Sequence, residues 1–298
     1  MDGPLVSVLI PVFNGERYVR QAIDSALGQT YPPHEIIVVD DGSTDSSRAI
    51  AESYGGKVVC IAQPNQGPSA ARNRLIEASS GDWIAFLDCD DYWFPDKLEK
   101  QVAAVKQNPP ADLIYTGRIE IDEYGRATDY PARSAEWVKR NLPVLNPIYP
   151  SSVLARRSVM QRQRWTTEFR SSEDWWFFYE LAKEANFCCI EEPTFYYRVH
   201  SQSLTNRNWR RVLEDARRVA RKIQADTHGL ERFTIRHRVD AKLLANAAVA
   251  ARIAEARGYF PFIVRSLLSW PFPDVMPERY RMCAVMLLQT LRGSQPGR

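Results

Sequence analysis

The chain has 298 residues, of which 45% are hydrophobic and 25% charged, and its net charge at pH 7 is +3. This length accommodates one full domain with an appended region, and the composition excludes a disordered or fibrous protein. No uninterrupted apolar segment reaches the ~20 residues that a membrane span needs, and no recognition motif accompanies the basic residues, which argues against nucleic-acid binding.

Apolar runs that are typical of buried strands alternate with helical spacings in the first third of the chain. The predicted strands and helices follow one another as Val6–Asn14, Tyr18–Leu27, Glu35–Val39, Ser46–Ser53, Lys57–Ala62, Ser69–Ala78 and Trp83–Leu87. Each turn from a strand into a helix is polar. This alternation predicts an α/β fold with a mainly parallel sheet in three layers, which binds a nucleotide at the carboxyl ends of its strands.

Three carboxylates, those of Asp88, Asp90 and Asp91, directly follow the last of these strands. Like charges this close are unfavourable unless a cation lies among them. A hard divalent ion, Mg²⁺ or Mn²⁺, that bridges these oxygens to a substrate diphosphate fits both the residue types and the position. The alternative is a solvated acidic turn, in which Asp91 caps the next helix, which begins near Pro95.

The blocks VSVLIPVFNGERY, EIIVVDDGSTDSS, NQGPSAARN and DWIAFLDCDDYW occur in this order within residues 5–100. They resemble the family 2 glycosyltransferases with the GT-A fold, and the resemblance continues more loosely to about residue 204. It implies a Rossmann-like sheet flanked by helices. It also implies an inverting, metal-dependent transfer of a sugar from a nucleoside-diphosphate donor, most often a UDP-sugar, to a glycan, lipid-linked or other hydroxyl acceptor.

The resemblance assigns several residues to the donor nucleotide. Pro11 and Phe13 match positions that line the nucleotide pocket, and Asp41 matches the carboxylate that accepts a hydrogen bond from the base. The alternative role of Asp41 is a turn or helix cap, for which its acidic neighbours are better placed. Arg72 matches a position that faces the nucleotide, and the alternative is a surface arginine on a solvated helix.

Asp88-Cys89-Asp90 matches the Asp-x-Asp motif of the family. By resemblance, Asp90 ligates the metal directly and Asp88 lies against the ribose or the metal. His200 ends a predicted strand, and in some relatives a histidine here completes the metal shell, although a lone histidine is more often structural. Arg198, in the same strand, is suited to clamp the diphosphate.

An inverting displacement needs a base that takes the proton of the acceptor hydroxyl. The segment that contains Ser172, Glu173 and Asp174 matches an acidic pair that opens a helix in the family. Asp174 is therefore the expected base, and Glu173 is expected to orient or bind the acceptor. The alternative is a structural role, in which Ser172 caps the helix and the two acidic side chains interact favourably with the helix dipole. Trp175 and Trp176 can stack on a sugar, although we expect at least one to pack in the core.

The middle of the chain is less regular. A strand is predicted at Ala111–Thr116, a hairpin at Arg118–Ala127 and a loop at Pro131–Pro150, and the segment Asn146–Leu154 is expected to lead into a strand before a helix near Arg156. Acceptor specificity is expected in this part, because loops on a rigid sheet carry it.

The charge changes sign after residue 204. Residues 1–204 carry 21 basic and 28 acidic side chains, whereas residues 205–298 carry 18 basic and 8 acidic ones, with predicted helices at Trp209–Thr227, Arg232–Arg257, Tyr259–Trp270 and Pro277–Leu291. We predict a catalytic domain at 1–204, with a nucleotide-binding half at 1–100 and an acceptor half at 101–204, and a basic helical region at 205–298. This region is suited to an anionic membrane surface. The alternative is a bundle that packs on the catalytic domain or on a second copy of the chain.

The five cysteines lack metal-finger spacing and fall within predicted strands and helices, which indicates reduced thiols. The first predicted strand begins almost at Met1, so we expect no secretory signal. These features predict a cytoplasmic protein that lies peripherally on the inner face of the cell membrane.

Two other functions share parts of the pattern. A sugar-1-phosphate nucleotidyltransferase needs a glycine-rich, basic phosphate loop after its first strand, where this chain has Pro11–Glu16. A non-catalytic module that binds nucleotide sugars has no use for a base such as Asp174. The transferase accounts for more of the sequence than either alternative.

Overall fold

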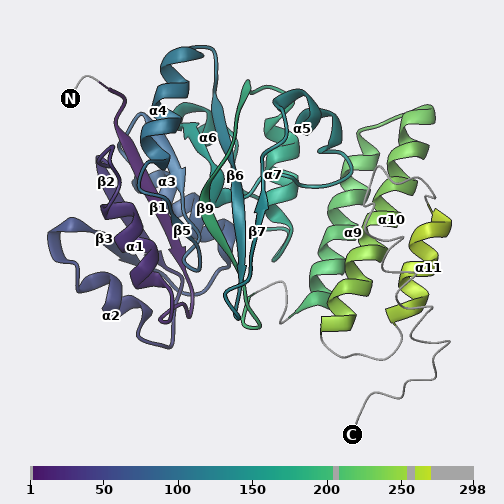
Figure 1. The fold of residues 1–298 in the computed structure, drawn as a ribbon, viewed down its shortest axis with the longest axis horizontal. Helices are drawn as coiled ribbons and strands as arrows, with labels where there is room; N and C mark the ends of the chain where they lie inside the picture. Colours follow the sequence, from purple (N-terminus) through teal and green to yellow (C-terminus); the bar gives the residue numbers. More distant parts are fainter. Residues whose placement is uncertain (1–2, 204–207, 254–258, 270–298) are drawn as a thin grey trace, which may run out of the picture. The chain divides into compact units, whose positions relative to one another are not determined.

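The computed structural model describes residues 3–203, 208–253 and 259–269 (Figure 1). The chain divides into two compact units, one of Met1–Leu142 and Asn146–His200 and the other of Pro143–Leu145 and Ser201–Arg298. Every strand of the described chain belongs to the first unit.

A nine-stranded sheet runs through the first unit. Its strands are β1 (Val6–Val12), β2 (Glu35–Asp40), β3 (Val59–Ala62), β4 (Trp83–Phe86), β5 (Tyr92–Trp93), β6 (Leu113–Asp122), β7 (Ala127–Tyr130), β8 (Leu154–Arg156) and β9 (Phe187–Val199). The order is β3-β2-β1-β4-β8-β6-β9-β5, and β7 pairs with β6. Strands β1 to β4 are parallel, as the sequence predicts. Beyond β4 the sheet is mixed, because β8 is antiparallel to both its neighbours.

Helices cover both faces of the parallel half (Figure 1). The helices of the first unit are α1 (Val19–Leu27), α2 (Ser47–Glu52), α3 (Pro68–Ala78), α4 (Lys97–Gln107), α5 (Ala135–Asn141), α6 (Arg157–Arg162) and α7 (Glu173–Leu181). Alternate residues of β1 form one core cluster with apolar residues of α1, α2 and α4. Helix α3 packs against β1 and β2, and its buried Leu75 and Ile76 lie outside that cluster. Because side chains of a strand alternate between faces, the parallel half has the three layers that were predicted.

The middle of the chain departs from the prediction in one place. The expected loop at Pro131–Pro150 contains helix α5, in which the Ser134 side chain caps the first turn by accepting from the Trp137 N–H. The segment Asn146–Leu154 leads through a 3₁₀ turn, η2 (Pro150–Ser152), into the short strand β8, and helix α6 follows at Arg157, as predicted. The predicted hairpin is confirmed as the antiparallel pair β6 and β7. The strand predicted at Ala111–Thr116 and the first strand of the hairpin form one continuous strand, β6, which begins at Leu113.

Helix α4 carries a buried lysine. Lys97 is 0% exposed, its Nζ donates to Oε1 of Gln101 at 2.6 Å, and the same atom lies 4.1 Å from the centre of the Trp93 ring. Burial lowers the pKa of Lys97 well below its usual value. Gln101 in turn donates to the backbone carbonyls of Ile114 and Ser152, at 3.3 and 2.9 Å, so the pair is part of the core between α4 and η2.

The second unit is helical where it is described. Its helices are α9 (Trp209–Ala225), α10 (Gly229–Ile253) and α11 (Tyr259–Ser269), and α10 packs against both of the others. These positions agree with three predicted helices, and the helix predicted at Pro277–Leu291 lies outside the described residues. In this part of the chain and in the first unit, no described helix has the length and apolar character to cross a membrane.

Candidate functional site

The order of the strands sets the place of the site. The chain passes from β1 to β2 and β3 on one side of β1, then returns to form β4 on the other side. In open α/β sheets, ligands bind outside the carboxyl ends of the strands at such a switch point. Phe13 follows β1, Asp41 follows β2, and Asp88 lies just beyond β4, so all three reach this edge of the sheet.

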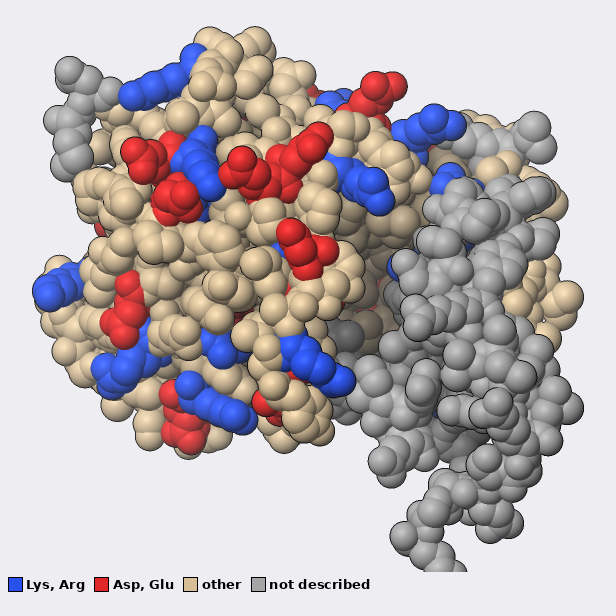
Figure 2. Space-filling model, viewed as in Figure 1, with Lys and Arg blue, Asp and Glu red and all other residues tan. Residues whose placement is uncertain are grey.

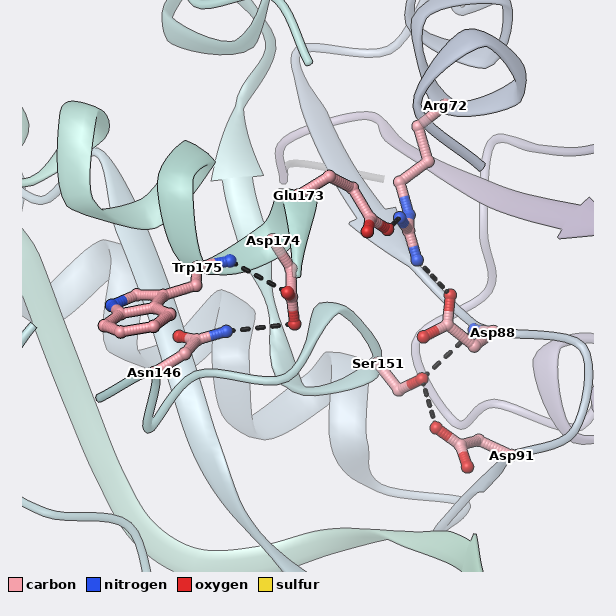
Figure 3. A network of polar contacts seen from close by, with 8 residues as sticks. All are labelled: Arg72, Asp88, Asp91, Asn146, Ser151, Glu173, Asp174 and Trp175. Atoms are coloured by element: carbon pink, nitrogen blue, oxygen red, sulfur yellow. Dashed lines mark hydrogen bonds and ion pairs between the residues drawn. The ribbon is translucent and has the colours of Figure 1, made fainter. Parts of the chain in front are cut away.

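Arg72 joins two carboxylates from distant parts of the chain (Figure 3). Its Nη1 donates to Oε1 of Glu173 at 2.7 Å and its Nη2 donates to Oδ1 of Asp88 at 2.8 Å. The residue is 6% exposed, and its guanidinium lies 4.6 Å from the centre of the Trp165 ring. Burial alone would lower the pKa of Arg72, but the two carboxylates raise it above the usual value. Arg72 is thus a buried ion-pair partner, and the alternative of a solvated surface arginine is wrong.

The loop after β4 is held by Ser151 in η2. The Ser151 hydroxyl accepts from the Asp88 backbone N–H at 3.0 Å and donates to Oδ2 of Asp91 at 2.6 Å. The other oxygen of Asp91 accepts from the backbone N–H of Arg198 at 3.1 Å. Asp91 is 2% exposed, so it is an internal anchor. The alternative of Asp91 as a helix cap is therefore wrong, because helix α4 begins only at Lys97.

Asp90 and His200 lie together. Nε2 of His200 is 3.1 Å from Oδ2 of Asp90, and the imidazole packs on the Tyr18 ring with the ring centres 4.8 Å apart. The described residues contain no group of three or more His, Cys, Asp or Glu side chains that could hold a metal by themselves. Asp90 and His200 instead fit an ion that takes further ligands from substrate phosphates and water, as Mg²⁺ commonly does.

Helix α7 begins with the predicted acidic pair. Oδ2 of Asp174 accepts from the Asn146 side-chain amide at 2.9 Å, and Oδ1 accepts from the backbone N–H of Trp175 at 2.8 Å (Figure 3). Burial and the neighbouring Glu173 raise the pKa of Asp174 to about 7. Ser172 has a left-handed backbone (φ 58°) and makes no side-chain cap, so capping does not explain this helix start. Trp175 is buried, and its indole donates to the Leu142 carbonyl.

Asp41 organises the segment before α3. Its Oδ1 accepts from the Gln63 side chain at 2.7 Å and from the Gln66 N–H at 2.9 Å, while Oδ2 accepts from the Gly67 N–H at 2.8 Å. Gly67 has a φ of 93°, a conformation that favours glycine. These bonds hold the residues that lead to Arg72. The turn role that was the alternative for Asp41 belongs to Asp40 and Asp45, whose side chains accept from the backbone N–H groups of Ser43 and Ser47.

The other predicted donor residues lie at the ends of β1 and β9. Pro11 is half-buried in β1, and Phe13, just beyond the strand, is 49% exposed and available for an apolar contact. The Arg198 guanidinium donates to the Gln21 side chain and lies 4.9 and 4.6 Å from the ring centres of Tyr18 and Tyr92.

Sequence reasoning did not find Asn146 or Ser151. Both belong to the segment NPIYPSS, in which Pro147 and Pro150 indicate a loop. The polar residues that flank these prolines are the available signal, but nothing near them in the sequence indicates which carboxylates they bind.

A family model described as "Glycosyl transferase family 2" matches residues 7–184. Uncharacterized glycosyltransferase RT0329 of Rickettsia typhi is 32% identical over 211 residues, which cover 68% of this chain and 66% of that protein. This chain therefore spans slightly less than two thirds of that relative.

Two solved structures share the fold. TarS 1–349 of S. aureus in complex with UDP has a TM-score of 0.64 and 20% identity, over 94% of this chain and 83% of that one. The mannosyltransferase PcManGT of Pyrobaculum calidifontis, in complex with GDP-Man and Mn²⁺, has a TM-score of 0.59 and 18% identity, over 98% and 88%. They confirm the predicted GT-A-like α/β fold.

Proposed function

The chain belongs to glycosyl transferase family 2, and on this premise we propose that it moves a sugar, with inversion, from a nucleoside-diphosphate donor to a hydroxyl of a glycan or lipid-linked acceptor. The observation that carries the proposal is the position of Arg72, which binds Asp88 of the acidic loop and Glu173 of the acidic pair at the same time. One guanidinium thereby holds a donor-side carboxylate next to an acceptor-side one.

The donor lies at the carboxyl edge of β1, β2 and β4 in this proposal. Phe13 contacts the base, and Asp41 and Asp88 contact the nucleoside, with a uridine nucleotide the first choice. TarS binds UDP and UDP-GlcNAc, and PcManGT binds GDP-Man, which supports a nucleotide-sugar donor. Arg198 is the candidate for the diphosphate.

Mn²⁺ or Mg²⁺ is the proposed cofactor, held by Asp90 and His200 with Asp88 nearby, and when bound it supplies positive charge against the departing diphosphate. Asp174 then takes the proton of the acceptor hydroxyl as that oxygen attacks the anomeric carbon and the bond to the diphosphate breaks. A carboxyl whose pKa is about 7 is half ionised near neutral pH, which suits a base that must both accept and release a proton.

Features of helix α9 favour the proposal that the protein binds its acceptors at a membrane surface. Its exposed side includes Arg210, Arg217 and Arg221, which recur at helical spacing, while Val219 and Ile223 are buried on the opposite side. Glu214 is an acidic residue exposed among these arginines, and on the first unit the face in Figure 2 shows basic and acidic side chains interspersed. We propose that α9 attracts anionic lipid headgroups from the cytoplasmic side.

Binding and hydrolysis together test the proposal. Isothermal titration of UDP, GDP and dTDP, each with and without Mn²⁺, identifies the nucleotide, and a panel of the corresponding sugars is then assayed for metal-dependent hydrolysis. Release of nucleoside diphosphate is expected. Synthesis of a nucleotide sugar from sugar 1-phosphate and nucleoside triphosphate would instead indicate a nucleotidyltransferase, and binding without turnover would indicate a binding module.

A further inference from the structure

The segment Asn146–Ser152, which leads from α5 to β8, contacts both sides of the candidate site. At one end, the Asn146 amide donates to Oδ2 of Asp174. At the other end, the Ser151 hydroxyl bonds to the Asp88 N–H and to Asp91. Figure 3 shows Asn146 beneath Asp174, and Ser151 between Asp88 and Asp91. A single short segment therefore touches both the proposed base and the acidic loop.

Both ends of this segment are themselves fixed. Oδ1 of Asn146 accepts from the Ile148 N–H at 3.1 Å, so the NH₂ group must face Asp174. The Ser151 carbonyl accepts from the Trp93 indole at 2.9 Å, and the next carbonyl, that of Ser152, accepts from Gln101 at 2.9 Å. Ser151 is fully buried. The orientations of both side chains are thus set by neighbours that do not belong to the site.

We infer that Asn146 and Ser151 are positioning residues for the transfer: Asn146 orients the carboxylate of Asp174, and Ser151 sets the position of the Asp88–Asp91 loop. The inference rests on the proposed function, in which Asp174 is the base and the acidic loop binds donor and metal. Because one segment of seven residues carries both side chains, it also sets the separation between base and donor loop. Groups that support metal ligands and bases from outside are commonly worth about 10–100-fold in affinity or activity.

The two residues act on different steps, so their variants have different signatures. Asn146→Ala removes a donor from the base, which is otherwise surrounded by Glu173, Arg72, Asp88 and Tyr149. It is expected to lower kcat for donor hydrolysis about 10-fold and to move the acidic limb of the pH–rate profile up by about one pH unit, with donor KM unchanged. Asn141→Ala, which removes a buried amide that donates to Trp137 within α5, is the matched control.

Ser151→Ala is expected to weaken Mn²⁺-dependent binding of nucleoside diphosphate at least about 10-fold in titration calorimetry, with the metal-free affinity nearly unchanged. Ser152→Ala is a close control, because the neighbouring hydroxyl donates only to the Tyr149 carbonyl among the described contacts. If Ser151→Ala does not fold, as judged by circular dichroism, Ser151→Cys keeps a weak donor of similar size and is expected to show the same change to a smaller degree.

A double-mutant cycle separates this inference from the proposed function. If Asp174→Asn abolishes hydrolysis, Asn146→Ala is expected to add little to it. A fully active Asp174→Asn enzyme would overturn the assignment of the base, and with it the role of Asn146. An inactive Asp174→Asn enzyme together with wild-type kcat and pH profile in Asn146→Ala, or wild-type Mn²⁺ dependence in Ser151→Ala, would overturn the inference alone.

Discussion

Nε2 of His200 lies 3.1 Å from Oδ2 of Asp90, although 110 positions separate the two residues in the sequence. His200 directly follows β9, and β9 pairs with β5, which follows the acidic loop directly. The sheet therefore brings an imidazole nitrogen and a carboxylate oxygen together from distant parts of the sequence. This is the pairing on which the proposed metal role depends.

Asp90→Ala is expected to abolish the increase in nucleotide affinity that Mn²⁺ gives, because it removes the proposed carboxylate ligand. The affinity measured with Mn²⁺ present should therefore decrease by about 10–100-fold. The loop should stay folded, since the carboxylate that anchors it is that of Asp91. Calorimetric titration of UDP with and without Mn²⁺ measures the effect, with the exposed Asp129→Ala as a control. Unchanged Mn²⁺ dependence in the Asp90 variant would remove it from the metal site.

Asp174→Asn is expected to lower kcat by about 10²–10⁴-fold with little change in donor KM, because the amide cannot take the acceptor proton. In the wild-type enzyme, the rate should rise with pH through about 7, because burial and Glu173 raise the pKa of Asp174 and only the ionised form acts as a base. Rates measured from pH 5 to 9 check both points. A rate that does not change across neutral pH, or an active Asp174→Asn variant, would contradict Asp174 as the base and make Glu173 the next candidate.

Arg72→Gln is expected to destabilise the protein by about 3–5 kcal/mol, because Glu173 is then a buried carboxylate without its cation. The Arg72 charge also lowers the pKa of Asp174, so its loss should move the acidic limb of the pH–rate profile upward. Urea unfolding measures the stability. Arg74→Gln, two residues away and 53% exposed in its side chain, should change stability by less than about 0.5 kcal/mol. Equal effects of the two changes would contradict the buried ion pair.

Lys97 is expected to make stability depend on pH. Its pKa is lowered in the folded protein, so between that value and the usual 10.5 the unfolded chain holds a proton that the folded chain lacks. The free energy of unfolding should therefore rise with pH in this window, by up to about 1.4 kcal/mol per unit. Lys97→Met should lose this slope. Urea unfolding at pH 7 and 9 compares the two proteins, and identical slopes would mean that Lys97 stays charged.

Replacement of Arg210, Arg217 and Arg221 by Gln is expected to weaken partitioning onto vesicles with phosphatidylglycerol by roughly 100-fold, since each basic residue contributes about 1 kcal/mol near such a surface. The same replacement of three exposed arginines of the first unit, Arg20, Arg126 and Arg162, is the control. Co-sedimentation of the wild-type protein should decrease with added salt. Equal recovery with neutral and anionic vesicles at low salt would leave α9 as a packing surface.

The sequence predicts those parts of the site that follow from local pattern. The apolar run Trp83–Leu87 indicates a strand, and the carboxylates after it must then lie at the sheet edge. The local pattern likewise predicts that Glu173 and Asp174 lie at the start of helix α7. The Asn146–Ser152 segment could not be placed in this way, because Ser151 meets Asp91 across 60 positions and Asn146 meets Asp174 across 28. Arg72 was expected to face the nucleotide, and its two ion pairs depend on packing that no local pattern encodes.

The strand order also has a consequence for synthesis on the ribosome. β8 lies between β4 and β6, and β9 joins β6 to β5, so the strands that complete the sheet are made last. Until they emerge, β4 and β6 expose unpaired backbone edges, which in other chains lead to association between molecules. Fragments that end before Phe187 are therefore expected to aggregate when expressed. A fragment that ends after His200 contains every described strand and is expected to aggregate less.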